Sequence, residues 1–301
     1  MPDLLIRAFH PELRVGLVAA IGTDVCQEAA LRHDATAAAA CALGRGILAG
    51  CLLAGLAGSQ RVTIQLQSNG PLKGLTVDAH DDGTVRGYPL AKAACPQARM
   101  DRRQRMADWL GRQGVVHVVR DVGLKERIVG QVSLLCGEVD EDLEAYLRES
   151  EQIPSALGTE LIFNNEGRIV AAGGVLLQTM PDSAKEAHVV LREAQHLLRS
   201  GGLYDLLAVS AQTPDAVSRF LLGLHGLGLI VHAETVLTFR CRCDKDRVAS
   251  LLRGLSAADL DEMIADGKAE IECNFCSTKY QISRQELLDI RRSQPQPTVS
   301  N

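Results

Sequence analysis

Short runs of alternating apolar and polar residues recur along the N-terminal part of the chain. Alternation places every second side chain on one face of a strand, and turn sequences such as Asn69-Gly70-Pro71 between the runs are typical of hairpins. We therefore expect a sheet-rich N-terminal region. The runs that predict strands are residues 4–22, 62–66, 72–79, 84–88, 115–120, 128–135, 161–163 and 170–177.

Helical spacing interrupts this strand pattern at three places. Residues 25–32 and 140–151 predict short helices, the second of them amphipathic. Residues 35–57 form a longer run rich in Ala, Leu and Gly that is long enough to raise the possibility of a membrane span. Because Arg45 lies near its middle, a buried central helix is favoured. Strands mixed with helices predict an α+β core domain over residues 1–183.

Residues 184–240 have a different pattern. Apolar residues recur at helical spacing as far as Leu198, the pair Gly201-Gly202 interrupts them, and short apolar segments continue to Val236. Further glycines lower the helix propensity of the later part. The pattern predicts a helical linker of low intrinsic stability, and an ordinary pair of interdomain helices would have the same composition.

Residues 241–292 predict a small C-terminal unit with its own helices and two short strands. Ser256 is a candidate N-cap for one helix, and Ser283 with Glu286 forms the sequence of a capping box for the last helix. A unit of about 50 residues cannot rely on its apolar core alone. The tail, residues 293–301, is rich in Gln and Pro and is predicted to be disordered.

Composition narrows the class of protein. The 301 residues are 46% hydrophobic, enough for a packed core, and the net charge of −5 does not indicate a nucleic-acid or anionic-membrane partner. The first residues lack the features of a secretory signal, so we expect a reducing cytoplasm, in which cysteines are thiols, metal ligands or sensors. Five of the nine cysteines are scattered and are predicted to be small core residues: Cys26, Cys41, Cys51, Cys95 and Cys136.

The other four cysteines form two close pairs, Cys241 with Cys243 and Cys273 with Cys276, separated by 29 residues. Two pairs of thiols at such a separation predict a tetrahedral four-thiolate zinc site with one Zn²⁺ per chain. The second pair has the spacing of an ordinary zinc knuckle. The first pair has only one intervening residue, so the chelate ring that it forms with the metal is smaller. Zinc contributes about 10–16 kcal/mol to small domains of this kind.

Thiolates that bind zinc are also the groups that oxidants attack. A redox-sensitive site and a purely structural zinc site have the same composition, and the spacing alone leaves both interpretations open.

Two other functions use similar residues. His232-Ala233-Glu234 followed by a later CxxC imitates the zinc-deaminase signature, in which the glutamate shuttles protons. Glu272 stands where that signature has proline, and Cys241 and Cys243 would have no role. A deaminase is therefore disfavoured.

A zinc ribbon that binds nucleic acid is the second alternative. Residues 241–293 contain nine basic and ten acidic residues, a formal net charge of −1, whereas nucleic acid requires a basic face. A basic run at residues 91–108 has no interleaved aromatic residues and predicts a loop and a solvated helix.

Several motifs in order along the whole chain resemble the redox-regulated 33-kDa heat-shock chaperone (33 kDa chaperonin) family. The resemblance begins with the two cysteine pairs, the preceding Phe239-Arg240 and the following Tyr280. The other matching segments are residues 70–74, 83–88, 137–138, 150–154, 173–178 and 180–181.

The resemblance implies an ATP-independent holdase and not an enzyme. It implies that Cys241, Cys243, Cys273 and Cys276 bind zinc while reduced and keep the chaperone inactive. Oxidation then forms Cys241–Cys243 and Cys273–Cys276 disulfides, releases zinc and unfolds the C-terminal unit with its linker. The active form, typically a homodimer, binds unfolding client proteins.

Asp244 departs from the family pattern, which often has a small polar residue there. This difference bears on the oxidation rate and not on metal binding. The shared core motifs contain no nucleophile–base pair, and we expect Arg86, Glu151 and Gln152 to be structural, with buried polar partners.

Overall fold

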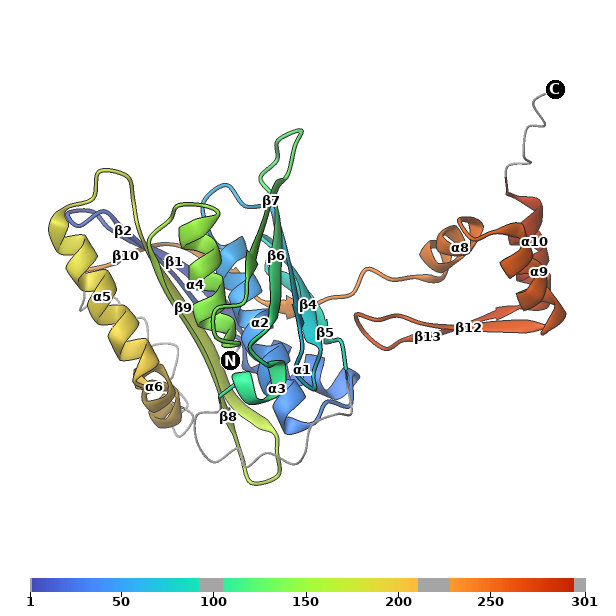
Figure 1. Cartoon of the computed structure of the whole chain (residues 1–301), viewed down its shortest axis with the longest axis horizontal. Coiled ribbons are helices and arrows are strands. Elements are labelled where there is room, and N and C mark those ends of the chain that lie inside the picture. Colours follow the sequence, from blue (N-terminus) through green and yellow to red (C-terminus); the bar gives the residue numbers. More distant parts are fainter. Residues whose placement is uncertain (1, 92–104, 211–227, 295–301) are drawn as a thin grey trace. The chain divides into compact units, whose positions relative to one another are not determined.

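The computed structural model of the protein describes residues 2–91, 105–210 and 228–294. The chain divides into two compact units, Met1–Arg240 and Cys241–Asn301, which contain different sheets (Figure 1). The mixture of sheets and helices confirms the predicted α+β fold.

The first sheet of the larger unit has five antiparallel strands in the order β10-β1-β2-β9-β8. Its central strand β2 buries six of its seven residues, and the central helix α2 (Ala37–Ala54) contacts it. The β8–β9 turn contains Gly167 with a φ of 77°, in the left-handed region that favours glycine. The strands are β1 (Leu4–His10), β2 (Val15–Ile21), β8 (Ser155–Phe163), β9 (Ile169–Thr179) and β10 (Ile230–Val236).

The second sheet has six strands in the order β11-β5-β4-β3-β6-β7. All neighbours are antiparallel except β11, which runs parallel to β5. The strands are β3 (Arg61–Ser68), β4 (Gly74–His80), β5 (Thr84–Pro89), β6 (Gly114–Asp121), β7 (Ile128–Ser133) and β11 (Thr238–Phe239).

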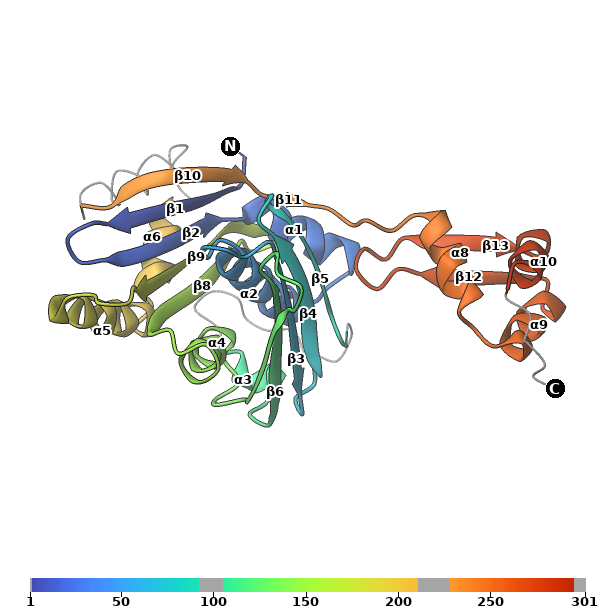
Figure 2. The same cartoon turned by 90° about the horizontal axis from the view of Figure 1, so that it is seen from above.

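Helix α2 (Ala37–Ala54) lies between the two sheets, with α1 (Thr23–Arg32) beside it (Figure 2). Its glycines permit this close approach: a Cβ on Gly44 would lie 2.4 Å from Leu161 of β8. A Cβ on Gly46 would lie 2.8 Å from Leu75 of β4. Among the described residues α2 is the one helix long and apolar enough to cross a membrane, and its window is 94% buried in the protein. The predicted buried central helix is confirmed.

Four more helices lie among the described residues of the larger unit before β10. Helix α4 (Val139–Glu149) packs on β7 and β8, and its inward side chains are buried as predicted. The short α3 (Ala107–Leu110) is the described end of the basic run at 91–108, whose residues 92–104 lie outside the described residues. Helices α5 (Lys185–Arg199) and α6 (Gly202–Ser210) contact β8 and β9.

The prediction that residues 184–240 are helical is wrong for their last part. Residues 185–199 and 202–210 are helices, but residues 230–236 and 238–239 are strands of the two sheets. The short apolar segments before Val236 have the period of a strand, and their partner β1 lies at the other end of the chain. Residues 211–227 lie outside the described residues.

The described residues of the smaller unit form three helices and a two-stranded hairpin. Ser256 and Ser283 cap their helices, and Glu286 completes the capping box, as predicted. An additional helix, α8, begins after Asp244, whose side chain accepts a hydrogen bond from the Arg247 amide. The elements are α8 (Lys245–Arg253), α9 (Ala257–Ala265), β12 (Lys268–Glu272), β13 (Lys279–Ser283) and α10 (Arg284–Arg292).

The apolar core of the smaller unit is slight. Six buried side chains form it: Val248, Leu252, Leu260, Ile282, Leu287 and Ile290. Small cores of this size rarely stabilise a domain without a metal or a disulfide. Of the predicted disordered tail, residues 295–301 lie outside the described residues.

Candidate metal centre

The four cysteines of the two close pairs meet in the smaller unit. Their Sγ atoms all lie within 4.8 Å of one another. The Cys241 and Cys273 Sγ atoms are 3.7 Å apart, and those of Cys243 and Cys276 are 3.3 Å apart. Zinc–sulfur bonds of about 2.3 Å in a tetrahedron separate the sulfurs by about 3.8 Å. All four are cysteines outside disulfides, and their spacing fits a tetrahedral thiolate metal site.

Cys273 and Cys276 occupy the turn that joins β12 to β13. The Ser277 amide donates to the Cys273 carbonyl over 2.8 Å, and the Cys273 amide donates to the Thr278 carbonyl over 2.9 Å. Ser277 has a φ of 54°, which turns the chain back tightly. The knuckle spacing read from the sequence therefore corresponds to a closed loop that directs both sulfurs inward.

Cys241 and Cys243 lie in the extended segment that leads into α8. Asp244 follows directly and caps the helix, so its side chain has a structural role. The Lys245 ammonium, one residue later, lies 2.6 Å from the Glu286 carboxylate of α10. Helix capping and this ion pair connect the first cysteine pair to the last helix.

Two hydroxyl groups contact the sulfurs. The Tyr280 hydroxyl donates to Cys243 Sγ over 3.1 Å, and the Thr278 hydroxyl lies 3.2 Å from Cys276 Sγ. Groups that hydrogen-bond to metal ligands orient them and tune the metal. The sequence indicated Tyr280 through its motif but gave no signal for Thr278.

Without a metal the crowded thiols do not ionise together. Burial raises the pKa of Cys243 to about 12 and also raises the pKa of Cys273. Burial also opposes ionisation of Cys276, but hydrogen bonds from Thr278 and the neighbouring thiols outweigh it and lower its pKa to about 7. A bound dication supplies the positive charge that lets the remaining thiols ionise.

The scattered cysteines lie elsewhere. Cys26, Cys41 and Cys51 are buried in the larger core, which confirms the prediction for these three. Cys136 is partly exposed, and its thiol donates to Glu141 over 3.3 Å. Cys95 lies outside the described residues.

The deaminase pattern finds no support in the ligand arrangement. Within the described parts of the chain, the four cysteines are the only group of three or more potential ligands close enough to hold a metal. His232 belongs to β10 in the larger unit.

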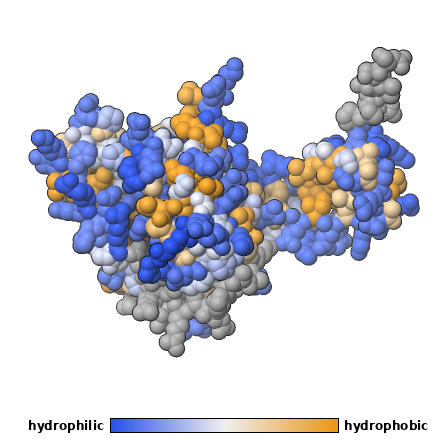
Figure 3. Space-filling view, in the orientation of Figure 1, coloured by the Kyte–Doolittle hydropathy of each residue, from blue (hydrophilic) through white to orange (hydrophobic). Residues whose placement is uncertain are grey.

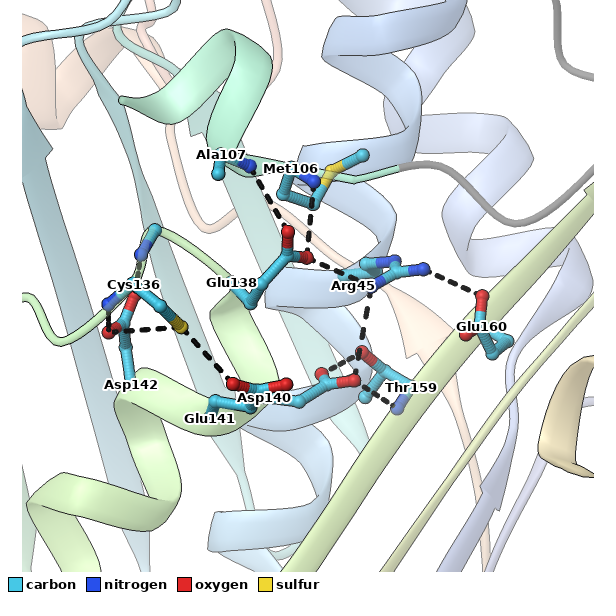
Figure 4. Close-up of polar contacts among 11 residues, drawn as sticks. Arg45, Met106, Ala107, Cys136, Glu138, Asp140, Glu141, Asp142, Thr159 and Glu160 are labelled. Carbon is cyan, nitrogen blue, oxygen red and sulfur yellow. Dashed lines mark hydrogen bonds and ion pairs between the residues drawn. The ribbon is translucent and has the colours of Figure 1, made fainter. Parts of the chain in front are cut away.

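A network of buried charges lies in the larger unit, around Arg45 of α2 (Figure 4). Its guanidinium lies 2.7 Å from Glu160, 3.9 Å from Glu138 and 4.0 Å from Asp140, and its side chain is 1% exposed. Glu138 also accepts hydrogen bonds from the Met106 and Ala107 amides. The sequence indicated Arg45 only as a break in an apolar run, and the network joins α2, α4 and β8.

Two of the three residues predicted to be structural have buried polar partners. Arg86 lies 2.9 Å from Asp78, and Glu151 pairs with Arg120 and accepts a hydrogen bond from Tyr146. Gln152 is exposed, so a buried partner for it was predicted wrongly. Its φ of 59° places it in a turn that tolerates few residues.

Comparison with known proteins identifies the family. The family model described as Hsp33 protein matches residues 3–283. The chain belongs to the Hsp33 family. Proteins named 33 kDa chaperonin resemble this family member over nearly their whole length. One from Rippkaea orientalis is 39% identical over 298 residues, 96% of each chain. One from Trichodesmium erythraeum is 36% identical over 302 residues, 99% of this chain and 96% of the relative.

A solved structure shares the fold of this Hsp33 family member. The crystal structure of the 33 kDa chaperonin (Heat shock protein 33 homolog) from Thermotoga maritima superposes with a TM-score of 0.79 at 26% identity. The match covers 97% of this chain and 98% of the other. Family and fold together support a chaperone that binds client proteins.

Proposed function

We propose that this Hsp33 family member is a redox-regulated, ATP-independent holdase whose switch is the four-cysteine centre. The observation that carries the proposal is the convergence of four sulfurs within 4.8 Å of one another in a unit with six buried apolar side chains. A fold with so small a core depends on whatever holds those sulfurs together.

Cys241, Cys243, Cys273 and Cys276 would hold one Zn²⁺ in the reduced protein. Four thiolates are soft ligands that favour zinc over hard cations such as Mg²⁺. Bound zinc would contribute about 10–16 kcal/mol of folding free energy to the unit. Residues 241–292 would form the switch and residues 184–240 the metastable segment that responds to it.

Oxidation would remove the ligands in pairs. In each pair two thiolates lose two electrons to form one disulfide, and one peroxide molecule takes up these electrons with two protons from the solvent to give two waters. Four thiolates would consume two peroxide molecules. The family resemblance assigns the bonds Cys241–Cys243 and Cys273–Cys276.

In the reduced unit the distances of 3.7 Å and 3.3 Å join the other pairs, Cys241 with Cys273 and Cys243 with Cys276. Peptide mapping of the oxidised protein therefore tests the assignment directly. Either set of bonds would consume the ligands and withdraw the stabilisation by the metal.

The active, oxidised form would bind partly unfolded proteins and prevent their aggregation during oxidative stress in the cytoplasm, as a homodimer. We expect no nucleic-acid partner, because residues 241–293 have a net charge of −1. We also expect no enzymatic activity, since the buried charges around Arg45 pair with one another.

Zinc stoichiometry in cysteine variants tests the ligand assignment. Cys273→Ser should lose tight zinc binding, whereas Cys136→Ser, which removes a partly exposed thiol elsewhere, should retain one zinc per chain. Normal zinc affinity in the Cys273→Ser protein would overturn the assignment.

A further inference from the structure

Strand β10 covers the edge of the five-stranded sheet without burying any of its own side chains. It is the outer neighbour of β1, and its seven residues alternate between exposed and half-buried. Strand β2, in the interior of the same sheet, buries six of its seven side chains. β10 therefore adds little apolar stabilisation, and its attachment depends mainly on the backbone.

The register between β1 and β10 shows which backbone groups hold β10 in place. The Leu237 amide donates to the Asp3 carbonyl over 2.9 Å, and Leu5 lies opposite Thr235. Because the backbone groups of antiparallel strands alternate in direction, Thr235 faces β1 and Glu234 faces away from it. A bulge between Arg7 and Ala8 interrupts the ladder further along.

β10 also lies close in sequence to the metal centre. Four residues separate Val236 from Cys241, and two of them form β11, which pairs with β5 through two residues. An edge strand without buried side chains opens at lower free energy than the core strands beneath it. Its exposure and its closeness in sequence to Cys241 make β10 a core element that unfolding of the C-terminal unit can release.

We propose that the edge of β1 is a client-binding surface that β10 covers in the reduced protein. The occupant is an extended, apolar segment of a non-native protein, which pairs antiparallel with β1 in the place that β10 leaves. This inference rests on the proposed redox-regulated function and assigns it a surface.

The pairing between β1 and β10 shows which properties a client segment needs in order to bind at the same edge. Pairing through the backbone accepts any sequence without proline at the ladder positions, which suits a chaperone with varied clients. Val231 of β10 packs against the apolar cluster that includes Ile6 and Ala8 of β1. A client segment with an apolar side chain at that position would bury the same surface.

Among the described residues, the six-stranded sheet has an edge strand that is not covered. Strand β7 is an edge strand with exposed apolar side chains, Val129 at 61% and Ile128 at 42%, and Figure 3 shows apolar surface near the β6–β7 hairpin. No strand of the described residues pairs with its outer edge. An edge that is open in the reduced protein is not controlled by the metal centre, whereas the edge of β1 is covered.

Amide hydrogen exchange of the full-length protein tests the proposal. The client probe is reduced, carboxymethylated α-lactalbumin, which stays unfolded and has no thiols to exchange. The Leu5 and Arg7 amides should be protected in the reduced protein, lose protection on oxidation and regain it when the probe is added. Protection that persists through oxidation would overturn the proposal, and so would amides that stay unprotected with the probe bound.

Two proline variants test whether opening the edge of β1 is sufficient for client binding without oxidation. Thr235→Pro removes an amide that faces β1, whereas Glu234→Pro places proline where the amide faces away. Reduced, zinc-loaded Thr235→Pro should bind the probe, and Glu234→Pro should behave like the parent. A Thr235→Pro protein with freely exchanging β1 amides and no probe binding would contradict the proposal.

Zinc release and aggregation suppression, measured on the same samples, distinguish the two hypotheses. If oxidation produces both effects while β1 stays protected, the inference fails and the proposed function stands. If oxidised protein without probe protects β1 only at high protein concentration, a second copy of the chain occupies the edge, and the client assignment is overturned.

Discussion

The hydroxyl of Tyr280 donates a hydrogen bond to Cys243 Sγ over 3.1 Å, from a strand that lies 37 residues further along the chain. A donor to a metal-bound thiolate reduces the charge on sulfur and fixes its direction. This contact couples the hairpin of the smaller unit to the first cysteine pair.

Tyr280→Phe keeps the ring and removes this donor. Zinc affinity should fall by about 10-fold or more, because loss of such an outer contact typically weakens metal binding 10–100-fold. Competition with a chromogenic chelator measures the change. Ser250→Ala is the control, since it removes a hydroxyl of the same unit that bonds to the Asp246 carbonyl and not to sulfur. Equal zinc affinity in the two variants would show that the phenol has no role at the metal.

Arg45→Met should strongly destabilise the larger unit. It leaves Glu160, Glu138 and Asp140 without the cation they surround, and breaking a buried ion pair typically costs about 3–5 kcal/mol. Guanidinium unfolding followed by fluorescence reports this unit alone, because the one tryptophan, Trp109, packs against its core.

The matched control for that variant is Arg148→Met. Arg148 pairs with Glu149 at the surface, where both side chains are more than half exposed, and such pairs contribute at most about 1 kcal/mol. A midpoint for Arg45→Met no lower than that of Arg148→Met would contradict the assigned role of the buried network.

Asp3 should make the larger unit more stable in mild acid. Burial raises the pKa of its carboxyl to about 6, although the Val25 amide donates to it over 2.8 Å. The unfolded chain has a pKa near 4, so between about pH 4 and 6 the folded state binds the extra proton. The stabilisation by protonated Asp3 is fully present below about pH 4 and is lost as pH rises through about 6. The free energy of unfolding falls by about 3 kcal/mol at most over this range.

Asp3→Asn removes this titration. The difference in unfolding free energy between parent and variant, followed through Trp109, should change between about pH 4 and 6 and be flat above about pH 7. A difference that does not vary with pH over that range would show that Asp3 has an ordinary pKa in the folded protein.

The sequence predicted those features of the fold that depend on residues close to one another in the chain. Ser256 and Ser283 cap helices a few residues away, and the knuckle spacing of Cys273 and Cys276 depends on one turn. Their partners are near in sequence, so residue type and spacing are sufficient. The buried helix around Arg45 was predictable for a similar reason, since apolar residues flank this single charge on both sides within one run.

Long-range contacts account for what the sequence did not predict. β10 pairs with β1 across more than 220 residues, and an alternating run such as Ile230–Val236 does not identify its distant partner. The three acidic partners of Arg45 come from two elements far along the chain. The contact of Thr278 with Cys276 has no sequence pattern of its own.

The central claim is that sulfur chemistry in the smaller unit controls client binding. Zinc content and suppression of aggregation of a heat-denatured client, measured on one sample before and after hypochlorite and again after reduction, test it most directly. Reduced protein should contain one zinc per chain and leave the client to aggregate. Oxidised protein should have lost the zinc and should keep the client soluble, and reduction with zinc should reverse both. Oxidised, zinc-free protein that leaves the client to aggregate, or reduced protein that protects it equally well, would contradict the account.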